Sequence, residues 1–185
     1  MPASCSIVRD PVTYLDTMDR NDKILIAVDE TDASLKAVGY VARLLGGRKD
    51  VHVRLFHVLP SIPPELLEYG GAENPRTEQQ LSAELHTAQH EWIEQAKRSA
   101  NASLESALVL LIDHGLLAEN ISTEFSSSIH KPDVAREVLE GAGKWDCGTI
   151  VTGRHCLPWT QEIFHRHVGE ELVHRARGVA VWVVG

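Results

Sequence analysis

The sequence contains little cysteine and no long hydrophobic run. Its three cysteines, Cys5, Cys147 and Cys156, lie far apart among 185 residues. This odd count and wide spacing argue against a disulfide framework and favour a reducing compartment. No apolar run reaches the roughly 18 residues that a membrane helix needs, and the N-terminus lacks the basic start and apolar stretch of a secretory signal. We therefore expect a cytoplasmic protein without a membrane span.

Positive charge is also scarce. The chain has 18 Lys and Arg residues against 26 Asp and Glu residues, which gives a net charge of −8. A general role in nucleic-acid binding is therefore not expected, although a local basic patch is compatible with these totals. The length suits one domain with a full core, and 43% hydrophobic residues is ordinary for a globular protein.

Sequence motifs of hydrolytic enzymes are missing as well. There is no Gly-x-Ser-x-Gly elbow and no His-Glu-x-x-His metalloprotease motif, so we predict no catalytic residue and do not expect an enzyme. His86 and His90 are four residues apart on a predicted helix and share a face. Two ligands do not make a zinc site, so the solvated helix surface is the preferred interpretation and no metal is predicted.

Strand-like and helix-like segments alternate along most of the chain. Short apolar runs predict strands at residues 23–29, 51–60, 119–129, 147–153 and 179–184. Apolar residues at helical spacing predict helices that begin near residues 32, 77, 132 and 160 and end near residues 45, 114, 144 and 177. Residues 1–21 are polar and aperiodic, so we expect a flexible extension before one domain at residues 22–185.

Several residues receive local roles in this prediction. Thr31, Asp32 or Ser34 caps the first helix; the glycines at 46–47 end that helix, and Gly115 ends the second. Residues 101–103 are a candidate kink, Asp133 is expected in the first turn of the third helix, and Cys147 is expected to begin a buried strand. Inward-facing positions are predicted at Ala37, Val38, Val41, Leu44 and Leu45 on the first helix and at Phe164, Val168, Leu172, Val173 and Ala176 on the last.

The alternation predicts an α/β fold with a single doubly wound parallel sheet and helices on both faces, because crossover connections are right-handed. Ligands bind such sheets in the crevice outside the carboxyl ends of the strands. Asp29 and the loop that opens at Gly153 should therefore face one crevice. The serines at 126–128 also lie at a strand end, where their hydroxyls either bind a ligand or end the strand.

Four segments taken in order resemble the universal stress protein family. They are "KILIAVDETDAS", "VRLFHVLP", "KPDVAREVLEGAGKWDCGTIVTG" and "VAVWVV", and the likeness covers about residues 22–185. The resemblance implies a five-stranded sheet in the order 3-2-1-4-5, of the adenine nucleotide alpha-hydrolase-like type. It also implies a cytoplasmic homodimer that pairs through the last strand, from Val179 to Val184. An apolar edge strand left unpaired would favour such association.

Many members of this family bind ATP, with a loop of glycine, two residues, glycine, nine residues, glycine, and serine or threonine. These positions correspond here to Gly153, Cys156, Arg166 and His167. The spacing is kept, but only the first position has the residue that lets backbone amides close on phosphate. The nucleoside half matches better, because the resemblance assigns Asp29 and Val58 to the nucleoside.

Two classes of function remain open at this point. In the first, the loop has lost ATP binding, and the chain is a dimeric regulatory protein of stress adaptation. In the second, side-chain cations replace the missing glycines and hold an anion or a short adenine nucleotide. A reactive Cys156 beside cationic neighbours is a further alternative. The candidate nucleotide- or anion-binding residues are Asp29, Val58, Gly153, Arg154, His155, Arg166, His167 and Val168.

Overall fold

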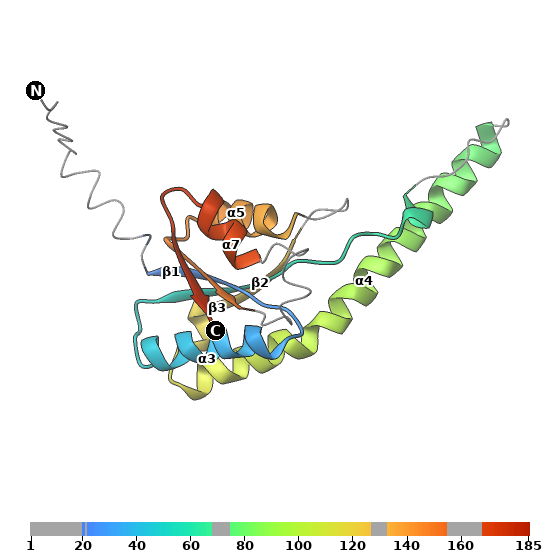
Figure 1. Cartoon of the computed structure of the whole chain (residues 1–185). Helices are drawn as coiled ribbons and strands as arrows, with labels where there is room; N and C mark the ends of the chain where they lie inside the picture. The colour runs from blue at the N-terminus through green and yellow to red at the C-terminus, as the bar shows by residue number, and fades with distance from the viewer. Residues whose placement is uncertain (1–19, 21, 68–74, 127–132, 155–167) are drawn as a thin grey trace, which may run out of the picture.

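Five parallel strands form one sheet at the centre of the protein (Figure 1). The computed structural model describes residues 20, 22–67, 75–126, 133–154 and 168–185; the predicted extension before residue 20 lies outside these ranges. The sheet order β3-β2-β1-β4-β5 confirms the predicted topology. The strands are β1 (Lys23–Ala27), β2 (His52–His57), β3 (Ile121–Phe125), β4 (Thr149–Gly153) and β5 (Ala180–Val184).

The central strand β1 is apolar because both of its faces are covered. Ile24, Leu25 and Ile26 are all buried, and the alternation of side chains sends them to opposite faces of the sheet. Leu25 belongs to one core cluster, whereas Ile24 and Ile26 belong to the other. The sheet therefore separates two hydrophobic cores, one under each pair of helices.

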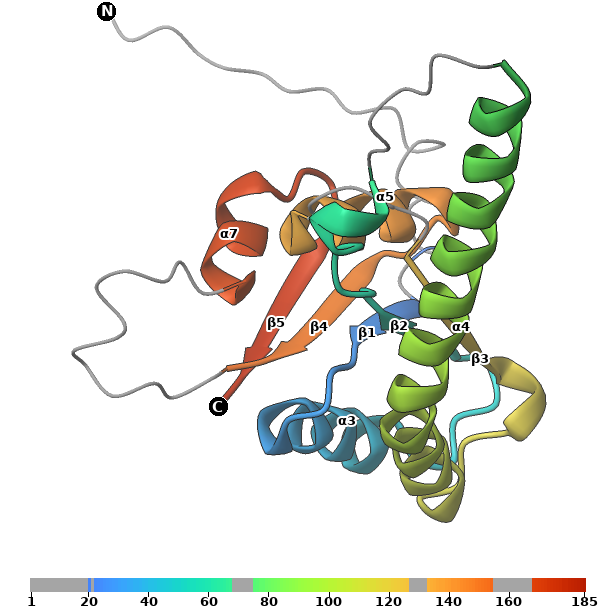
Figure 2. The same ribbon diagram turned by 90° about the vertical axis from the view of Figure 1, so that its right-hand side faces the viewer.

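Two pairs of helices cover the two faces (Figure 2). The helices α3 (Asp32–Leu45) and α4 (Pro75–Asp113) lie on one side, and α5 (Val134–Lys144) and α7 (Val168–Arg175) lie on the other. Short 3-10 helices occur at Pro64–Leu66 (η1) and Ala118–Asn120 (η2). Within the described ranges, no helix has both the length and the hydropathy to cross a membrane.

The ends of α3 follow the predicted signals. Thr31 is the N-cap, and its Oγ1 accepts a hydrogen bond from the amide of Ser34 at 3.3 Å. Gly46 is the C-cap, and Gly47 adopts a φ of 80° that favours glycine. The inward prediction for Leu44 is wrong, because this side chain is 53% exposed. Leu44 lies about 100° around the helix from buried Leu45, just outside the apolar face.

The helix α4 is 39 residues long and continues without a break through residues 101–103. Its last third packs against the sheet and α3, whereas its first part extends beyond the sheet (Figure 1). There Gln89 donates a hydrogen bond from Nε2 to the carbonyl of Leu66 in η1, at 2.6 Å. Gly115, with a φ of 90°, follows the end of the helix as predicted. The buried residues of the packed part are Ala100, Leu104, Ala107 and Leu111.

Asp133 is the N-cap of α5 rather than a residue of its first turn, which corrects the prediction. Its carboxylate accepts a hydrogen bond from the amide of Arg136 at 3.1 Å. Arg175 of α7 donates from Nη1 to both oxygens of the same carboxylate, at 2.9 and 2.7 Å. These interactions with the amide and with Arg175 hold the pKa of Asp133 below its ordinary value. One carboxylate therefore caps α5 and ties α7 to it.

The described part of α7 starts at Val168, so residues 160–167 of the predicted last helix, with Phe164, lie outside the described ranges. Leu172 is fully buried, as predicted. The inward prediction for Val173 is wrong, because 55% of this residue is exposed. Helical geometry turns Val173 about 100° away from Leu172, and there it borders a cavity instead of the core.

Candidate functional site

A cavity of about 580 Å³ opens where β1, β2 and β4 end. This is the edge of a parallel sheet at which ligands bind, because the chain reverses from strand to helix there. The first turns of α5 and α7 complete the wall with Val134 and Val168. The volume lies within the range of small-molecule sites.

The structure places five of the eight candidate residues around this cavity. They are Asp29, Val58, Gly153, Arg154 and Val168. The other three candidates, His155, Arg166 and His167, lie outside the described residues, as does Cys156. Arg154 and Val168 are the described residues on either side of that segment, and both line the cavity. Both ends of the segment that corresponds to the phosphate loop therefore meet at the cavity.

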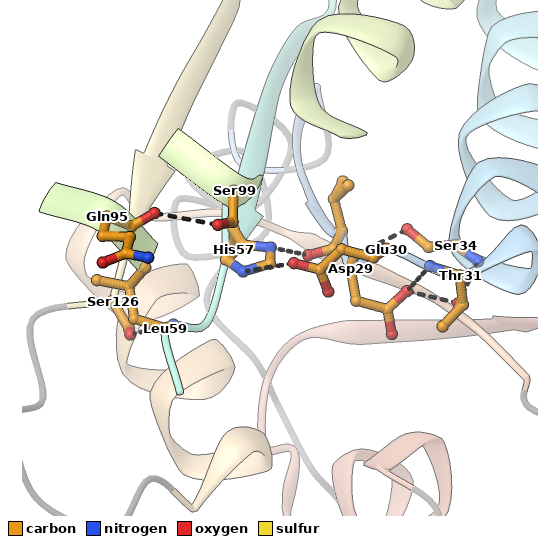
Figure 3. A network of polar contacts seen from close by, with 10 residues as sticks. Asp29, Glu30, Thr31, Ser34, His57, Leu59, Gln95, Ser99 and Ser126 are labelled. Carbon is orange, nitrogen blue, oxygen red and sulfur yellow. Dashed lines mark hydrogen bonds and ion pairs between the residues drawn. The ribbon is translucent and has the colours of Figure 1, made fainter. Parts of the chain in front are cut away.

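The carboxylate of Asp29 is oriented by the turn that leads into α3 (Figure 3). Its Oδ1 accepts hydrogen bonds from the amide of Thr31 at 3.0 Å and from the Thr31 hydroxyl at 2.5 Å. The amide of Asp29 donates to Oγ of Ser34 at 3.1 Å. This turn leaves Asp29 half-buried at the cavity wall.

Gly153 is required by packing, whatever the loop binds. A Cβ on this residue would lie 2.7 Å from the amide nitrogen of Ser34 and closer still to the carbonyl of Ala33. The end of β4 therefore touches the first turn of α3 backbone to backbone. The next amide, that of Arg154, donates to the carbonyl of Val184 at 2.6 Å and so belongs to the sheet. Close approach accounts for the glycine without a phosphate.

Gly169 lies in a less severe close approach, to side chains and not to backbone, that the sequence did not reveal. A Cβ there would meet Cγ1 of Val183 at 3.1 Å and Cγ2 of Thr152 at 3.5 Å. This close contact brings the first turn of α7 against β4 and β5. Only the position of α7 relative to those strands shows why a small residue is needed, since a lone glycine inside a helical pattern has no specific meaning.

Two titratable residues of α7, Glu170 and His174, also line the cavity, and sequence reasoning missed both. Nδ1 of His174 donates to the backbone carbonyl of Glu170 at 2.8 Å. Their spacing of four residues places them on one face with Val173 between them in sequence. The spacing of four residues was the feature of the sequence that could have indicated a shared site for Glu170 and His174. The same spacing of charged residues is usual on solvated helix faces.

The remaining wall is apolar. Phe56, Val58 and Val134 come from β2, the residue after it and α5. Such a wall can hold a flat, weakly polar ring by burying its faces. The lining also includes the acidic residues Asp29 and Glu170 and one arginine, Arg154, whose side chain also lies beside Gly185. A lining with both apolar and charged residues can hold a molecule that has a flat ring and an anionic group.

His57 links the ends of β1 and β2 behind the cavity and was not assigned a role from sequence. Its side chain is 5% exposed, and Nδ1 donates to the carbonyl of Val28 at 2.8 Å (Figure 3). The opposite nitrogen, Nε2, lies 3.7 Å from a carboxylate oxygen of Glu30. A buried imidazole with a backbone partner holds the two strand ends together.

Ser126 ends its strand and does not line the cavity. Its amide donates to the carbonyl of His57 at 2.9 Å, and its hydroxyl accepts from the amide of Leu59 at 3.0 Å. Of the two interpretations given for this serine cluster, the structure supports the strand-end role for Ser126. The serines at 127 and 128 lie outside the described residues.

Metal and thiol chemistry find little support in the part of the chain that the structure describes. His86 and His90 are exposed, and no group of three metal-ligating side chains comes together among the described residues. Cys147 is buried, as predicted, but it does not begin the strand, because β4 starts at Thr149. Burial raises the pKa of its thiol. A thiol in that setting is a small apolar side chain and not a nucleophile.

A sequence model of the universal stress protein family matches residues 20–185. The chain belongs to this family. No curated protein sequence matches it. Solved structures of the family share its fold: one from Archaeoglobus fulgidus is 17% identical, with a TM-score of 0.57, over 93% of this chain and 98% of the other.

Two further relatives were solved with a nucleotide. A universal stress protein family protein from Arabidopsis thaliana with AMP bound is 15% identical, with a TM-score of 0.53, over 88% of this chain and 90% of that chain. The universal stress protein from Archaeoglobus fulgidus in complex with dAMP is 18% identical, with a TM-score of 0.52, over 88% and 97%. Similarity at this level of identity shows the common fold.

Proposed function

We propose that this universal stress protein binds an adenine nucleotide with a single phosphate in the cavity at the carboxyl ends of β1, β2 and β4. The observation that carries the proposal is the meeting of Asp29, Val58 and Arg154 around one cavity of about 580 Å³. Relatives with the same fold were solved with AMP and with dAMP. Binding would make the protein a nucleotide-responsive regulator of stress adaptation in the cytoplasm.

Each part of the nucleotide has a matching part of the wall. Phe56, Val58 and Val134 cover the faces of the base. The carboxylate of Asp29, oriented by the turn at Thr31, accepts a hydrogen bond from a ribose hydroxyl. The guanidinium of Arg154 pairs with the phosphate, since an arginine binds phosphate oxygens in a bidentate way.

A triphosphate fits this site poorly. Among the described residues that line the cavity, Arg154 is the one Lys or Arg, and Asp29 and Glu170 are carboxylates. The first turn of α7 carries Glu170 and Glu171, which oppose an anion at that helix end. Each added phosphate would bring more negative charge to a site whose described lining offers one arginine and two carboxylates. We therefore expect affinity to fall from AMP to ADP to ATP.

Calorimetric titration and thermal unfolding with adenosine, AMP, ADP, ATP and inorganic phosphate test this function. A nucleotide at about 100 times its dissociation constant should stabilise the fold by about 2.7 kcal/mol. We expect Arg154→Ala to weaken AMP binding by about tenfold, the size of one lost charge-assisted hydrogen bond, and to leave adenosine binding unchanged.

The matched control is Arg98→Ala, which removes an exposed arginine from α4, away from the cavity lining. It should leave all affinities unchanged. Binding of AMP, ADP and ATP with equal affinity would contradict the single-phosphate site. The absence of a shift with every ligand would contradict the function itself. Arg166→Ala, in the same assay, reports whether this arginine contributes to binding.

We also propose that the protein is a homodimer that pairs through its last strand, from Val179 to Val184. In the described residues β5 pairs with β4 alone and so forms an edge of the sheet. Beside it, Tyr40 of α3 is 42% exposed and meets Trp182 edge to face, with ring centroids 6.2 Å apart. Exposed aromatic surface next to an open strand edge favours pairing of two copies.

Sedimentation velocity tests the dimer. Tyr40→Glu places a charge beside the strand edge and should shift the protein towards monomer. Val109→Glu changes a residue of α4 that is 55% exposed and should not. A monomeric wild-type protein at micromolar concentration would contradict the proposal.

A further inference from the structure

The strand β5 forms an edge of the sheet and also a wall of the cavity. Among the described strands it pairs with β4 alone, so one of its sides carries backbone groups without a strand partner. Its five residues include no charged side chain and no proline, which commonly protect such an edge from pairing. Val183 of this strand lines the cavity. Whatever pairs with β5 therefore lies beside a residue of the ligand site.

The cavity wall near this edge is apolar and exposed. Val173 of α7 and Val183 both line the cavity, and they are 55% and 41% exposed. Gly169 brings α7 against β5, because a Cβ there would lie 3.1 Å from Cγ1 of Val183. Val173 lies one helical turn beyond Gly169, on nearly the same side of α7. A second surface laid against the two valines would extend the cavity wall and remove it from water.

The arginine that pairs with phosphate in the proposed site is attached to the same strand. The amide of Arg154 donates to the carbonyl of Val184 at 2.6 Å. Its side chain lies beside Gly185, with Cδ 3.8 Å from a Cβ built on that glycine. The end of β5 therefore positions Arg154. A strand held by a partner would hold this arginine more rigidly, and a preorganised group binds its ligand at a lower cost in entropy.

A second copy of this chain is the partner that fits this edge. Two β5 strands can pair antiparallel about a two-fold axis, because the same backbone groups are then used by both copies. Pairing centred on Trp182 would place Val183 opposite Val181 of the second copy, on the face that α7 covers. On the other face, Tyr40 is 42% exposed beside Trp182. Apolar side chains therefore flank the edge on both faces of the sheet.

We infer that a second copy paired at β5 completes the nucleotide site, so that AMP and the second copy bind cooperatively. This coupling rests on the proposed function and on the proposed pairing of β5. In the dimer, the second copy covers Val173 and Val183, and the paired strand holds Arg154 ready for the phosphate. AMP therefore binds the dimer more tightly than the monomer. By linkage, AMP strengthens the dimer, and the nucleotide controls the association of the protein.

The size of the effect depends on the number of cavities. A dimer contains two of them, so saturation with AMP lowers the dimer dissociation constant by the square of the factor that each cavity gains in affinity. Coupling between two binding sites commonly changes affinity by about fivefold or more. Binding that is about fivefold tighter in each cavity gives a dimer dissociation constant that is about 25-fold lower.

Sedimentation velocity of the wild-type protein over a range of concentrations, without ligand and with saturating AMP, tests the coupling. We expect the dimer dissociation constant to fall about 25-fold with AMP. Where the wild type is dimeric at the lowest concentration, Tyr40→Ala brings the association into the measurable range, because it removes an exposed ring beside the edge. A dimer that is weaker with AMP than without it would overturn the inference.

Calorimetric titration with AMP gives the reciprocal readout. Tyr40→Glu opposes pairing but changes a residue outside the cavity lining, and we expect it to bind AMP about fivefold more weakly than the dimeric wild type. Wild-type protein diluted below its dimer dissociation constant should bind AMP as weakly as this variant. A local effect of the substitution would instead leave the wild-type affinity independent of dilution, and that result would overturn the coupling. Val109→Glu, on an exposed part of α4 outside the lining, is the matched control and should keep the wild-type behaviour in both assays.

The possible outcomes separate the coupling from the two proposals beneath it. If AMP binds neither the monomer nor the dimer, the proposed function fails and the coupling fails with it. If AMP binds but the protein stays monomeric at every concentration, with and without AMP, the pairing and the coupling fail while the nucleotide site stands. If AMP binds and the protein dimerises with the same dissociation constant in both conditions, the coupling alone is overturned.

Discussion

The replacement Gly153→Ala tests whether this glycine is needed for its close packing against α3 or for phosphate binding by the loop that follows it. In the structure, the added Cβ would lie 2.7 Å from the amide nitrogen of Ser34 and closer still to the carbonyl of Ala33. Both are backbone atoms of the first turn of α3, so no side-chain rotation can relieve the contact. The strand end or the helix start has to move, and overpacking of this kind costs about 1–3 kcal/mol.

We expect the upper part of this range, about 2–3 kcal/mol, because the obstructing atoms are backbone. For a chain of 185 residues, each kcal/mol lowers the melting temperature by about 2–4 °C, which gives a decrease of about 4–12 °C. The effect should be present in ligand-free protein, since packing and not phosphate is its cause. Urea unfolding and thermal scans without nucleotide measure it.

The matched control is Gly143→Ala in the last turn of α5. A Cβ there meets nothing within 4 Å, so the change should stabilise the helix by about 0.5–1 kcal/mol. If Gly153→Ala unfolds within about 0.5 kcal/mol of the wild type, the steric argument is refuted. The glycine would then have to be explained by the loop that follows it.

Three further predictions concern stability. Leu172→Ala should cost about 2–5 kcal/mol by urea unfolding, whereas Val173→Ala, next to it but facing the cavity, should cost under about 0.5 kcal/mol; equal losses would contradict the burial pattern. Thr31→Ala should cost about 1 kcal/mol through the lost cap, and Thr31→Ser should restore most of it. Asp133→Asn keeps a capping side chain but loses the ion pair with Arg175. Because the pKa of Asp133 is lowered in the folded state, the stability difference from the wild type should be full at neutral pH. It should shrink as the pH falls through the folded pKa, and a pH-independent difference would contradict this.

The fold was predictable because its signals are local and repeated. Each strand buried on both faces needs a continuous apolar run, and each covering helix needs an apolar stripe. Crossovers in parallel sheets have one hand, so few topologies remain. The wrong predictions of inward-facing side chains concern helix residues at the boundary between the core and the exposed face. Leu44 and Val173 are apolar and next to buried positions, but each lies one helical step outside the core.

The site was predictable in part for the same reason. Asp29 and Gly153 follow strands of a parallel sheet, and topology alone sends such residues to one edge. Glu170 and His174 could not be assigned, because charged residues at helical spacing occur on every solvated helix. Whether that face meets solvent or a cavity depends on how α7 packs on β5, and the contact of Gly169 with Val183 sets this packing.

The amino-acid sequence by itself determined the order of strands and helices along the chain, the presence of a capping residue among Thr31, Asp32 and Ser34, and the glycines that end α3 and β4. These features follow from hydrogen bonding and burial within a few consecutive residues. Only the tertiary structure decided what Gly153 contacts, which face of α7 borders the cavity, and that Val183 of the edge strand β5 lines it. Those facts depend on the distance between segments far apart in the chain, and packing of the two cores against the sheet fixes that distance.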